Sequence, residues 1–161
     1  DRTAYVIRKY GSEDRAGRIY GSIVEIGQSV DIDFAFERID RTPNSVDTHR
    51  LVMFAARQGV ADVMVEGLFV EYFLNGRNIG ERGVLRDIAR EAGLKVSSVD
   101  AYLDGEDDVE RVYDESSRAH RLAINGVPAF VFNERMVIAG AQEPQVLARM
   151  LDAALVTDDA A

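Results

Sequence analysis

The sequence predicts a mainly helical α/β domain that ends in a β-hairpin and a final helix. Apolar residues recur at helical spacing through most of the first 123 residues. Two short apolar runs follow, 129–133 and 136–139, joined by a turn that begins at Asn133. Pro144 then opens a last amphipathic stretch, because proline suits the first turn of a helix, where no amide donor is needed.

Stop and cap residues divide the first part of the chain. A helix over residues 1–10 is expected to end at Gly11, and Ser12 is expected to cap the next helix. The apolar stripe of that second helix consists of Ala16, Ile19, Tyr20 and Ile23. The period then changes to two over residues 31–36, which predicts a short extended segment with one buried face.

The middle of the chain is predicted to be a block of helices. Ser45 follows a turn at Pro43 and is expected to cap a helix that runs to about Gln58. Residues 60–74 are apolar nearly all round, which is typical of a helix in the middle of a bundle. Further helices are expected over residues 81–92, from Ser97 or Ser98 to Leu103, and over 107–123, the last ended by Asn125-Gly126.

The hairpin requires partners that the rest of the chain does not supply. Both of its strands are apolar on both faces, as in strands that lie inside a sheet. A two-stranded hairpin alone is only marginally stable in water. Residues 31–36 are the one other strand candidate. We therefore expect partner strands from an N-terminal segment that this chain lacks, or from another chain.

Composition excludes several classes of function. With 19 basic and 28 acidic residues the net charge is −9, which disfavours nucleic acid as a partner. No apolar run approaches the roughly 18 residues of a membrane-spanning helix. The chain has no cysteine, so it offers no disulfide, thiolate metal site or cysteine nucleophile. With only two histidines a multi-histidine metal centre is also excluded, and we expect no metal.

Few residues stand out as candidates for chemistry. Gly126-Val127-Pro128 leads directly into the first strand of the hairpin. A cis proline there would turn the Val127 amide and carbonyl outward, toward an extended peptide, whereas a trans proline would only mark the start of the strand. His49 is either a proton shuttle or ligand donor, or a partly buried helix residue that touches a neighbour.

Two further features are interpreted as structural. His120 lies near the C-terminal end of a helix, where its charge would complement the helix dipole. The acidic run over residues 104–110 lacks the ligand spacing of a calcium loop, and acids at a helix N-terminus need no ion. Spacing and composition alone therefore define no catalytic constellation.

Several motifs together resemble a known family. They are Thr42-Pro43-Asn44-Ser45, Thr48-His49-Arg50-Leu51, Ile124-Asn125-Gly126-Val127-Pro128-Ala129-Phe130-Val131-Phe132-Asn133 and Ile138-Ala139-Gly140-Ala141-Gln142. In this order they resemble the DsbA-like thioredoxin family, and within it the FrnE-type predicted dithiol–disulfide isomerases. These are related to 2-hydroxychromene-2-carboxylate isomerases and kappa-class glutathione transferases. The resemblance covers about Tyr5 to Leu151.

The resemblance implies a thioredoxin-like α/β fold with a helical insertion, in a single domain over 1–161 that is N-terminally incomplete. The insertion would cover about 12–123, and the C-terminal thioredoxin half, with its cis-proline loop, hairpin and final helix, about 124–155. The chain would be mostly helical because the first strand–helix–strand unit, which carries Cys-x-x-Cys in the family, is absent. The implied activity is thiol–disulfide exchange, in which a thiolate attacks a substrate disulfide.

The resemblance also implies roles for individual residues. Pro128 would be the cis-proline beside the cysteine pair, Val127 would bind substrate through its backbone, and Gly126 would permit the loop. His49 and Asn44 would present polar groups toward the cleft. The segment 140–142 would shape the end of the hairpin and the start of the last helix. No residue of this cysteine-free chain would be catalytic, and the chain alone would be redox-inactive.

Three functions remain open at this point. The first is a thiol–disulfide oxidoreductase or isomerase that acts on a protein or small-molecule substrate and needs no further cofactor. The second is a glutathione-dependent isomerase or transferase on the same scaffold, with glutathione as its cofactor. The third is a cysteine-free module that binds extended peptides or pairs strands in a homodimer. The lack of structural cysteines favours a cytoplasmic location.

Overall fold

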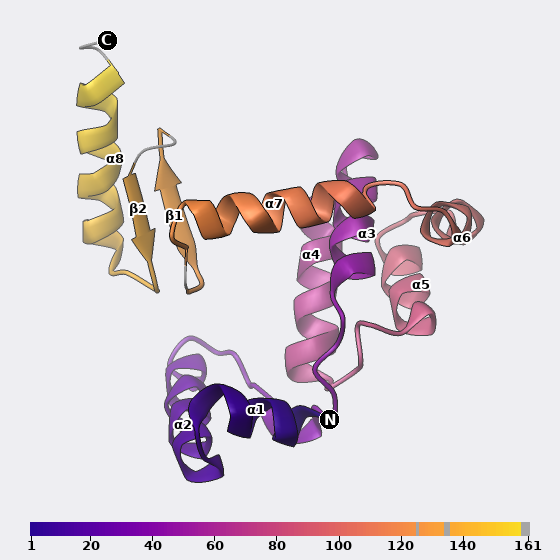
Figure 1. Cartoon of the computed structure of the whole chain (residues 1–161), viewed down its shortest axis with the longest axis horizontal. Helices are drawn as coiled ribbons and strands as arrows, with labels where there is room; N and C mark the ends of the chain where they lie inside the picture. Colours follow the sequence, from indigo (N-terminus) through magenta and orange to yellow (C-terminus); the bar gives the residue numbers. More distant parts are fainter. Residues whose placement is uncertain (125, 134–135, 159–161) are drawn as a thin grey trace. The chain divides into compact units, whose positions relative to one another are not determined.

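The chain forms eight α-helices and one two-stranded antiparallel sheet within the residues that the structure describes (Figure 1). This structure is a computed structural model, and it describes residues 1–124, 126–133 and 136–158. The chain divides into two compact units, Asp1–Val112 and Tyr113–Ala161, called unit 1 and unit 2 below. Each unit is described by itself.

Unit 1 begins with two helices that start where the sequence predicts, and the first also ends at Gly11 as predicted. Helix α1 is Arg2–Tyr10 and α2 is Glu13–Gln28. The carboxylate of Asp1 accepts the Ala4 amide, and the Ser12 hydroxyl accepts the Arg15 amide. These side chains satisfy N-terminal amide groups that have no partner inside the helix, which confirms the predicted starts.

The predicted extended segment over residues 31–36 is not a strand. Phe34 and Phe36 do lie on the same side, with ring centroids 5.1 Å apart, as the alternation predicts. However, the Ala35 amide donates to the Phe73 carbonyl, and residues 36–38 form a 3₁₀ turn, η1 (Phe36–Arg38). The aromatic rings pack against Tyr20 and Phe73 rather than against a neighbouring strand. The period-2 pattern therefore reflects an aromatic cluster, and the strand prediction was wrong.

The core of unit 1 lies among four helices and one π-helical turn. They are α3 (Val46–Arg57), α4 (Ala61–Phe69), η2 (Val70–Leu74), α5 (Arg82–Glu91) and α6 (Val96–Asp104). One continuous buried cluster joins the four α-helices, and η2 contributes no buried residue to it: Leu51, Ala55, Met64, Leu68, Val84, Leu85, Ile88, Ala89, Ala92, Val99, Tyr102 and Leu103. Helix α6 begins at Val96, slightly before the predicted Ser97 or Ser98.

Helix α4 differs from its prediction in two ways. The predicted single helix over 60–74 ends as an α-helix at Phe69 and continues as the π-turn η2. Met64 is fully buried, but Val63 and Phe69 are 55% and 56% exposed. An all-round apolar helix was expected in the middle of a bundle. Within unit 1 its neighbours cover only part of it, which leaves apolar surface open.

Helix α7 (Val109–Arg121) leads into unit 2, which contains the hairpin and the last helix. Strands β1 (Ala129–Phe132) and β2 (Met136–Ala139) pair antiparallel, with Ala129 opposite Ala139 and Phe132 opposite Met136. Helix α8 (Pro144–Asp158) packs against β1. Hairpin and last helix are thus confirmed. The helix predicted over 107–123 and ended by Asn125-Gly126 ends earlier, at Arg121, because the chain turns at Ala123. Asn125 itself and the Glu134-Arg135 part of the turn lie outside the described residues.

Candidate functional site

The loop before β1 is built by the sharp end of α7 and by an extension of the hairpin. Ala123 has a left-handed φ of 56°, and the Ile124 amide returns to the Ala119 carbonyl, which closes the helix. At the other end of the loop, the Pro128 carbonyl accepts the Gly140 amide at 2.7 Å. The Val127–Pro128 peptide bond is cis. Strand pairing therefore holds the loop at Pro128 and leaves the residues before it free.

Val127 is the most prominent residue of this loop. Its side chain is 89% exposed, the largest value among the exposed large hydrophobic residues of the described chain. Within the described part of the chain, neither its amide nor its carbonyl makes a hydrogen bond. A free donor and acceptor beside a strand are the groups that an extended peptide uses in strand addition. The loop can therefore offer backbone hydrogen bonds and one apolar contact.

The two glycines that flank the hairpin differ in what they require. A Cβ on Gly126 would meet open space, and its φ lies outside the left-handed range. The expectation that glycine is needed there to permit the loop has no steric support. Gly140, by contrast, has a φ of 91°, and its carbonyl accepts the Gln142 amide group at 3.4 Å. The 140–142 segment thus shapes the end of the hairpin, as predicted.

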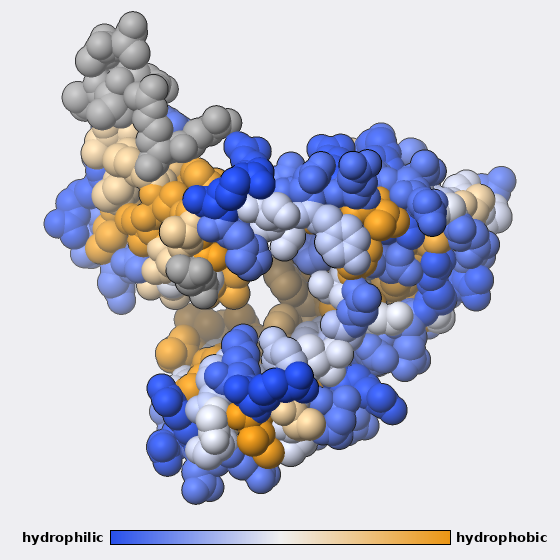
Figure 2. Space-filling model, viewed as in Figure 1, coloured by the Kyte–Doolittle hydropathy of each residue, from blue (hydrophilic) through white to orange (hydrophobic). Residues whose placement is uncertain are grey.

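The sheet has one covered face and one open face. Side chains that lie opposite each other in an antiparallel pair share a face, so Phe130 and Phe132 share one with Ile138 and Met136. The Asn133 amide group donates to the Ala154 carbonyl of α8 at 2.8 Å at the end of β1, and Phe132 is buried. On the opposite face Val131 is 43% exposed. Figure 2 shows apolar side chains gathered on the visible surface of the hairpin and α8.

Asn44 lies at the start of α3 in unit 1, where it has a structural task. Its side-chain oxygen accepts the Val46 amide at 3.0 Å. Ser45 occupies the N-cap position, but its hydroxyl makes no capping bond, so the predicted serine cap was wrong. Asn44 instead forms an Asx turn that satisfies the amide of the first helical residue. The predicted substrate contact of Asn44 stays a prediction.

His49 is one turn further along α3 and is exposed. The alternative of a partly buried histidine that touches a neighbour was therefore wrong. No side-chain hydrogen bond of His49 occurs among the described residues. Its neighbours Thr48 and Arg50 are buried and turn inward, which leaves the imidazole on the outer side of the helix. An exposed imidazole is free to meet a ligand, and that role also stays a prediction.

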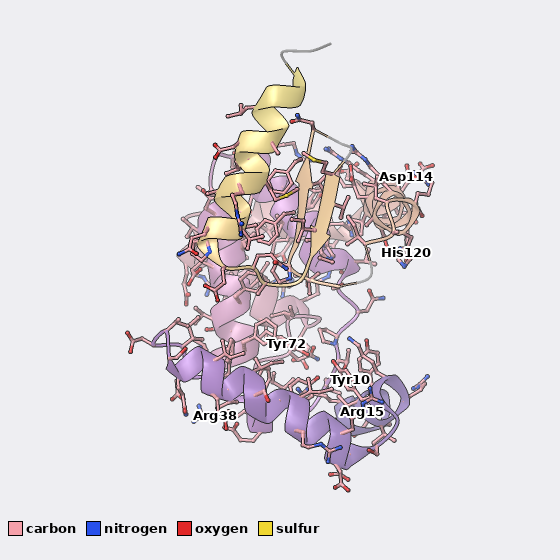
Figure 3. The ribbon with its side chains drawn as sticks, turned by 90° about the vertical axis from the view of Figure 1, so that its left-hand side faces the viewer. Tyr10, Arg15, Arg38, Tyr72, Asp114 and His120 are labelled. Atoms are coloured by element: carbon pink, nitrogen blue, oxygen red, sulfur yellow. The ribbon has the colours of Figure 1, made fainter. Side chains whose placement is uncertain are left out.

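His120 and the acidic run have structural partners. The Nδ1 atom of His120 lies 2.8 Å from the Ser116 carbonyl on exposed α7, where Figure 3 labels it. In the acidic run, the Tyr102 hydroxyl and the Arg57 guanidinium donate to Asp108 and hold the pKa of that carboxyl below its usual range. Among the described residues no three acidic or histidine side chains are placed to hold a metal ion.

Arg50 is the structurally important residue that sequence reasoning missed. It is 3% exposed, and its guanidinium donates to the carbonyls of Tyr102, Leu103, Gly105 and Asp107 and to the Asp47 carboxylate. These contacts use all five N–H groups, because the guanidinium fork fits several carbonyls at once. The available signal was the acidic residue Asp47 three residues before it, one turn away on the same helix. The bonds join α3 to the α6–α7 connection.

The structure brings the candidate residues together in two separate groups. Gly126, Val127 and Pro128 form one continuous loop in unit 2, and Asn44 and His49 lie at the start of α3 in unit 1. In the first group the available chemistry is backbone hydrogen bonding and apolar contact. In the second it is one amide and one imidazole. Neither group contains a thiol, because the sequence has no cysteine.

Comparison with known proteins identifies a solved structure with a similar architecture. No curated protein matches the sequence. Among solved structures, a probable DsbA oxidoreductase from Streptomyces coelicolor has a TM-score of 0.81 and is 24% identical in sequence. The match covers 93% of this chain and 65% of that chain, so this chain spans about two thirds of that protein's length. At this identity the likeness shows the fold.

None of the described helices is long and apolar enough to cross a membrane.

The family follows from the sequence itself. The sequence model of the DSBA-like thioredoxin domain matches residues 6–152, which is most of the chain and includes α3, the loop before β1, the hairpin and most of α8. The chain therefore belongs to the DSBA-like thioredoxin domain family.

Proposed function

We propose that this chain is the helical and C-terminal part of a thiol–disulfide oxidoreductase or isomerase of the FrnE-type branch. In this proposal the loop Gly126–Pro128 binds the substrate polypeptide beside a cysteine pair that this chain does not contain. The observation that carries the proposal is Val127, whose side chain is 89% exposed and whose backbone has no partner within the described residues. Family membership supports the type of chemistry.

The chemistry needs thiols from outside this chain. A thiolate attacks one sulfur of the substrate disulfide, forms a mixed disulfide and releases the second substrate sulfur as a thiolate. A second thiolate of the pair then attacks the mixed disulfide, so that the pair is oxidised and the substrate gains two electrons. This chain contributes binding and orientation, through the Val127 backbone and the apolar surface around it. His49 and Asn44 would add polar contacts to the same substrate.

The proposal is tested by binding to the chain itself. A ¹⁵N-labelled sample is titrated with a short extended peptide that carries an internal disulfide. The Val127 amide should shift because it gains a hydrogen bond, together with the first residues of β1. Pro128→Ala should weaken binding about fivefold, because loss of the ring frees φ at the anchor of the loop and raises the entropy cost of binding.

Matched variants separate binding by the loop from loss of structure. Pro144→Ala changes a proline at the exposed start of α8, far along the chain from the loop, and should leave peptide affinity unchanged. In the protein form that carries the cysteine pair, Pro128→Ala should lower kcat/KM for disulfide reduction by a similar factor. Peptide-induced shifts that avoid residues 126–131 would refute the proposed binding site.

Further measurements distinguish the remaining alternatives. Glutathione binding at the loop, measured by calorimetry on the cysteine-free chain, would favour the glutathione-dependent isomerase or transferase. Peptide binding without disulfide chemistry in any longer form would favour the peptide-binding module. If sedimentation shows a dimer and the Val131→Lys variant is monomeric, the partner strands of the hairpin would come from a second copy of this chain. The proposed cytoplasmic location rests on the lack of structural cysteines and is tested by fractionation.

A further inference from the structure

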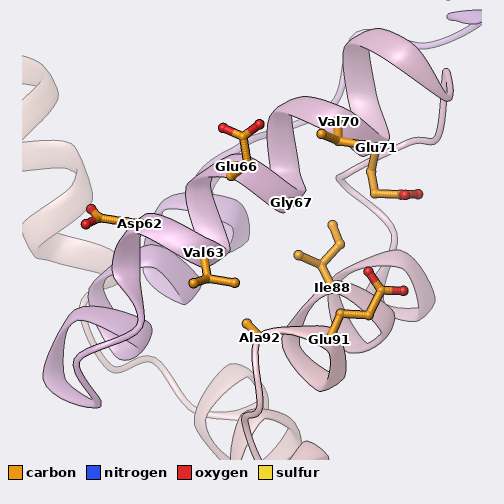
Figure 4. Close-up of a pocket in the computed structure, with 9 residues that line it drawn as sticks. All are labelled: Asp62, Val63, Glu66, Gly67, Val70, Glu71, Ile88, Glu91 and Ala92. Carbon is orange, nitrogen blue, oxygen red and sulfur yellow. The ribbon is translucent and has the colours of Figure 1, made fainter.

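A groove outside the proposed substrate loop lies between α4, η2 and α5, all in unit 1. Its volume is about 580 Å³. We call it the α4–α5 groove, and Figure 4 shows its lining. The lining residues are Asp62, Val63, Glu66, Gly67, Val70, Glu71, Ile88, Glu91 and Ala92.

The floor of the α4–α5 groove is apolar and held in shape by a close helix contact. A Cβ on Gly67 would come within 2.8 Å of the Ile88 side chain, so glycine allows α4 and α5 to approach each other. Figure 4 shows Ile88 directed from α5 toward Gly67. On the same lining, Val63 is 55% exposed although it is a large apolar residue. The floor therefore offers apolar contact to an occupant.

The rim of the α4–α5 groove carries one sign of charge. Its four charged residues, Asp62, Glu66, Glu71 and Glu91, are all acidic. Glu71 pairs with Arg77 at 2.8 Å. Among the described residues the other three carboxylates have no ion-pair partner, and a cationic side chain is absent from the lining. Unpaired carboxylates around an apolar floor would attract a group that is cationic and apolar at once.

We propose that the α4–α5 groove binds an amphipathic helix with a basic face, supplied by a partner protein. The α4–η2 wall from Asp62 to Glu71 is about 14 Å long at helical rise, enough for two to three turns of a bound helix. Asp62 and Glu66 are spaced i, i+4 on α4, so lysines or arginines at the same spacing on the partner can face them. The apolar face of the partner covers Val63 and the floor.

The electrostatics favour a different protein over a second copy of this chain. The chain has a net charge of −9, so two copies repel each other at long range. A basic helix is attracted at the same distance. The proposal therefore predicts binding that weakens as salt screens the carboxylates, whereas a purely apolar contact would strengthen or stay constant.

The test uses the full chain and a defined probe, a fluorescein-labelled 14-residue helical peptide of lysine and leucine with lysines on one face. Fluorescence anisotropy measures its affinity at 50 and 500 mM NaCl. The groove variant Asp62→Asn/Glu66→Gln/Glu91→Gln should bind about tenfold more weakly at low salt, because three exposed ion pairs each contribute a modest share. Raising the salt should weaken binding to the unchanged chain several-fold.

Two matched controls show whether the peptide binds in the α4–α5 groove. The variant Glu25→Gln/Glu37→Gln/Glu115→Gln removes the same three charges from exposed positions outside the groove, and should change affinity less than twofold. Val63→Ser should weaken binding about threefold, whereas Val30→Ser, at a residue 60% exposed in the loop after α2, should have no effect. Circular dichroism shows that each variant keeps its helical content.

Several results would overturn the proposal. Equal losses in the two charge variants would mean general attraction to an acidic chain. Equal affinity for a peptide of glutamate and leucine would remove the role of charge. A concentration-dependent dimer that the groove variant dissociates would make the occupant a second copy. A small organic cation that binds as tightly as the peptide would replace the helix as occupant.

Discussion

The two units of this chain differ in how completely they bury their apolar side chains. In unit 1 the residues Leu51, Met64 and Leu85 are fully shielded inside one cluster that joins α3 to α6. In unit 2, as far as it is described, Phe132 and Ala154 are the buried hydrophobic residues. The strands of unit 2 are no less apolar, yet one face of the hairpin leaves Val131 half open.

The difference shows that helices and strands differ in how many of their faces must be covered by neighbouring elements. Four amphipathic helices can shield one another, because each has a single apolar stripe. A strand that is apolar on both faces needs a layer on each side and a hydrogen-bonded neighbour at each edge. Within its described residues, unit 2 supplies one layer, α8, and one neighbour for each strand. The proposed substrate loop directly precedes β1, the strand that carries Val131 on the open face.

The largest expected effect is at Arg50 in unit 1. Arg50→Ala should lower the free energy of unfolding by about 4 kcal/mol, because it leaves several buried carbonyls without donors. Urea denaturation measures this. Arg86→Ala, which removes an exposed ion pair to Asp100, should leave the midpoint of urea denaturation almost unchanged. A loss for Arg50→Ala as small as that of the control would show that the buried network adds nothing.

Leucine truncations compare the two units directly. Leu85→Ala should cost about 3 kcal/mol because it opens a cavity in the cluster of unit 1. Leu155→Ala in α8 should cost under about 0.5 kcal/mol, since Leu155 is 69% exposed. Thermal and urea unfolding of both variants measure the difference. Similar losses would mean that Leu155 is covered in solution and that unit 2 is better packed than described.

A pair of helical glycines should respond with opposite signs. Gly67→Ala should destabilise unit 1 by about 2 kcal/mol, because the new Cβ would lie 2.8 Å from Ile88. Gly21→Ala in α2 should stabilise the chain by about 0.7 kcal/mol, since a Cβ there meets open space and alanine favours the helix. Melting temperatures of the two variants provide the measurement. Stabilisation by both would show that α4 and α5 do not approach closely.

The pKa of Asp108 makes part of the stability of unit 1 depend on pH. The Tyr102 hydroxyl and the Arg57 guanidinium lower this pKa, so the carboxylate stabilises the fold above its unfolded pKa of about 4. That stabilisation is lost as pH falls through the lower folded value. Asp108→Asn should cost about 1 kcal/mol at pH 7, and the difference from the unchanged chain should close in strong acid. A gap that is the same at pH 7 and pH 2 would contradict this assignment.

The smallest expected effect is on the open face of the hairpin. Val131→Thr keeps the β-branched shape and adds a hydroxyl, so it should cost under about 0.5 kcal/mol while that face stays uncovered. Denaturation of the chain alone supplies the value. In a longer form that covers this face, the same substitution should cost clearly more, because the hydroxyl would be buried without a partner. A large cost in the chain alone would remove the contrast between the two units.

The sequence by itself determined most of the helices and the hairpin. Asp1 and Ser12 cap their helices through bonds to amides only three residues away, which is information that lies within the local sequence. The two-sided apolar strands also predict a larger sheet around the hairpin, which stays a prediction. The motif around Pro128 identified the family. It pointed to a loop that lies exposed beside a strand, although its role in binding stays a prediction.

Only the tertiary structure decided the features that depend on distant partners. The alternation over 31–36 looked like a strand, but Phe73 and Tyr20 provide the packing, and both are remote in sequence. Arg50 is buried because carbonyls more than 50 residues away accept its hydrogens. Local patterns determine where helices begin and end, whereas burial is decided by neighbours that no short window of sequence contains.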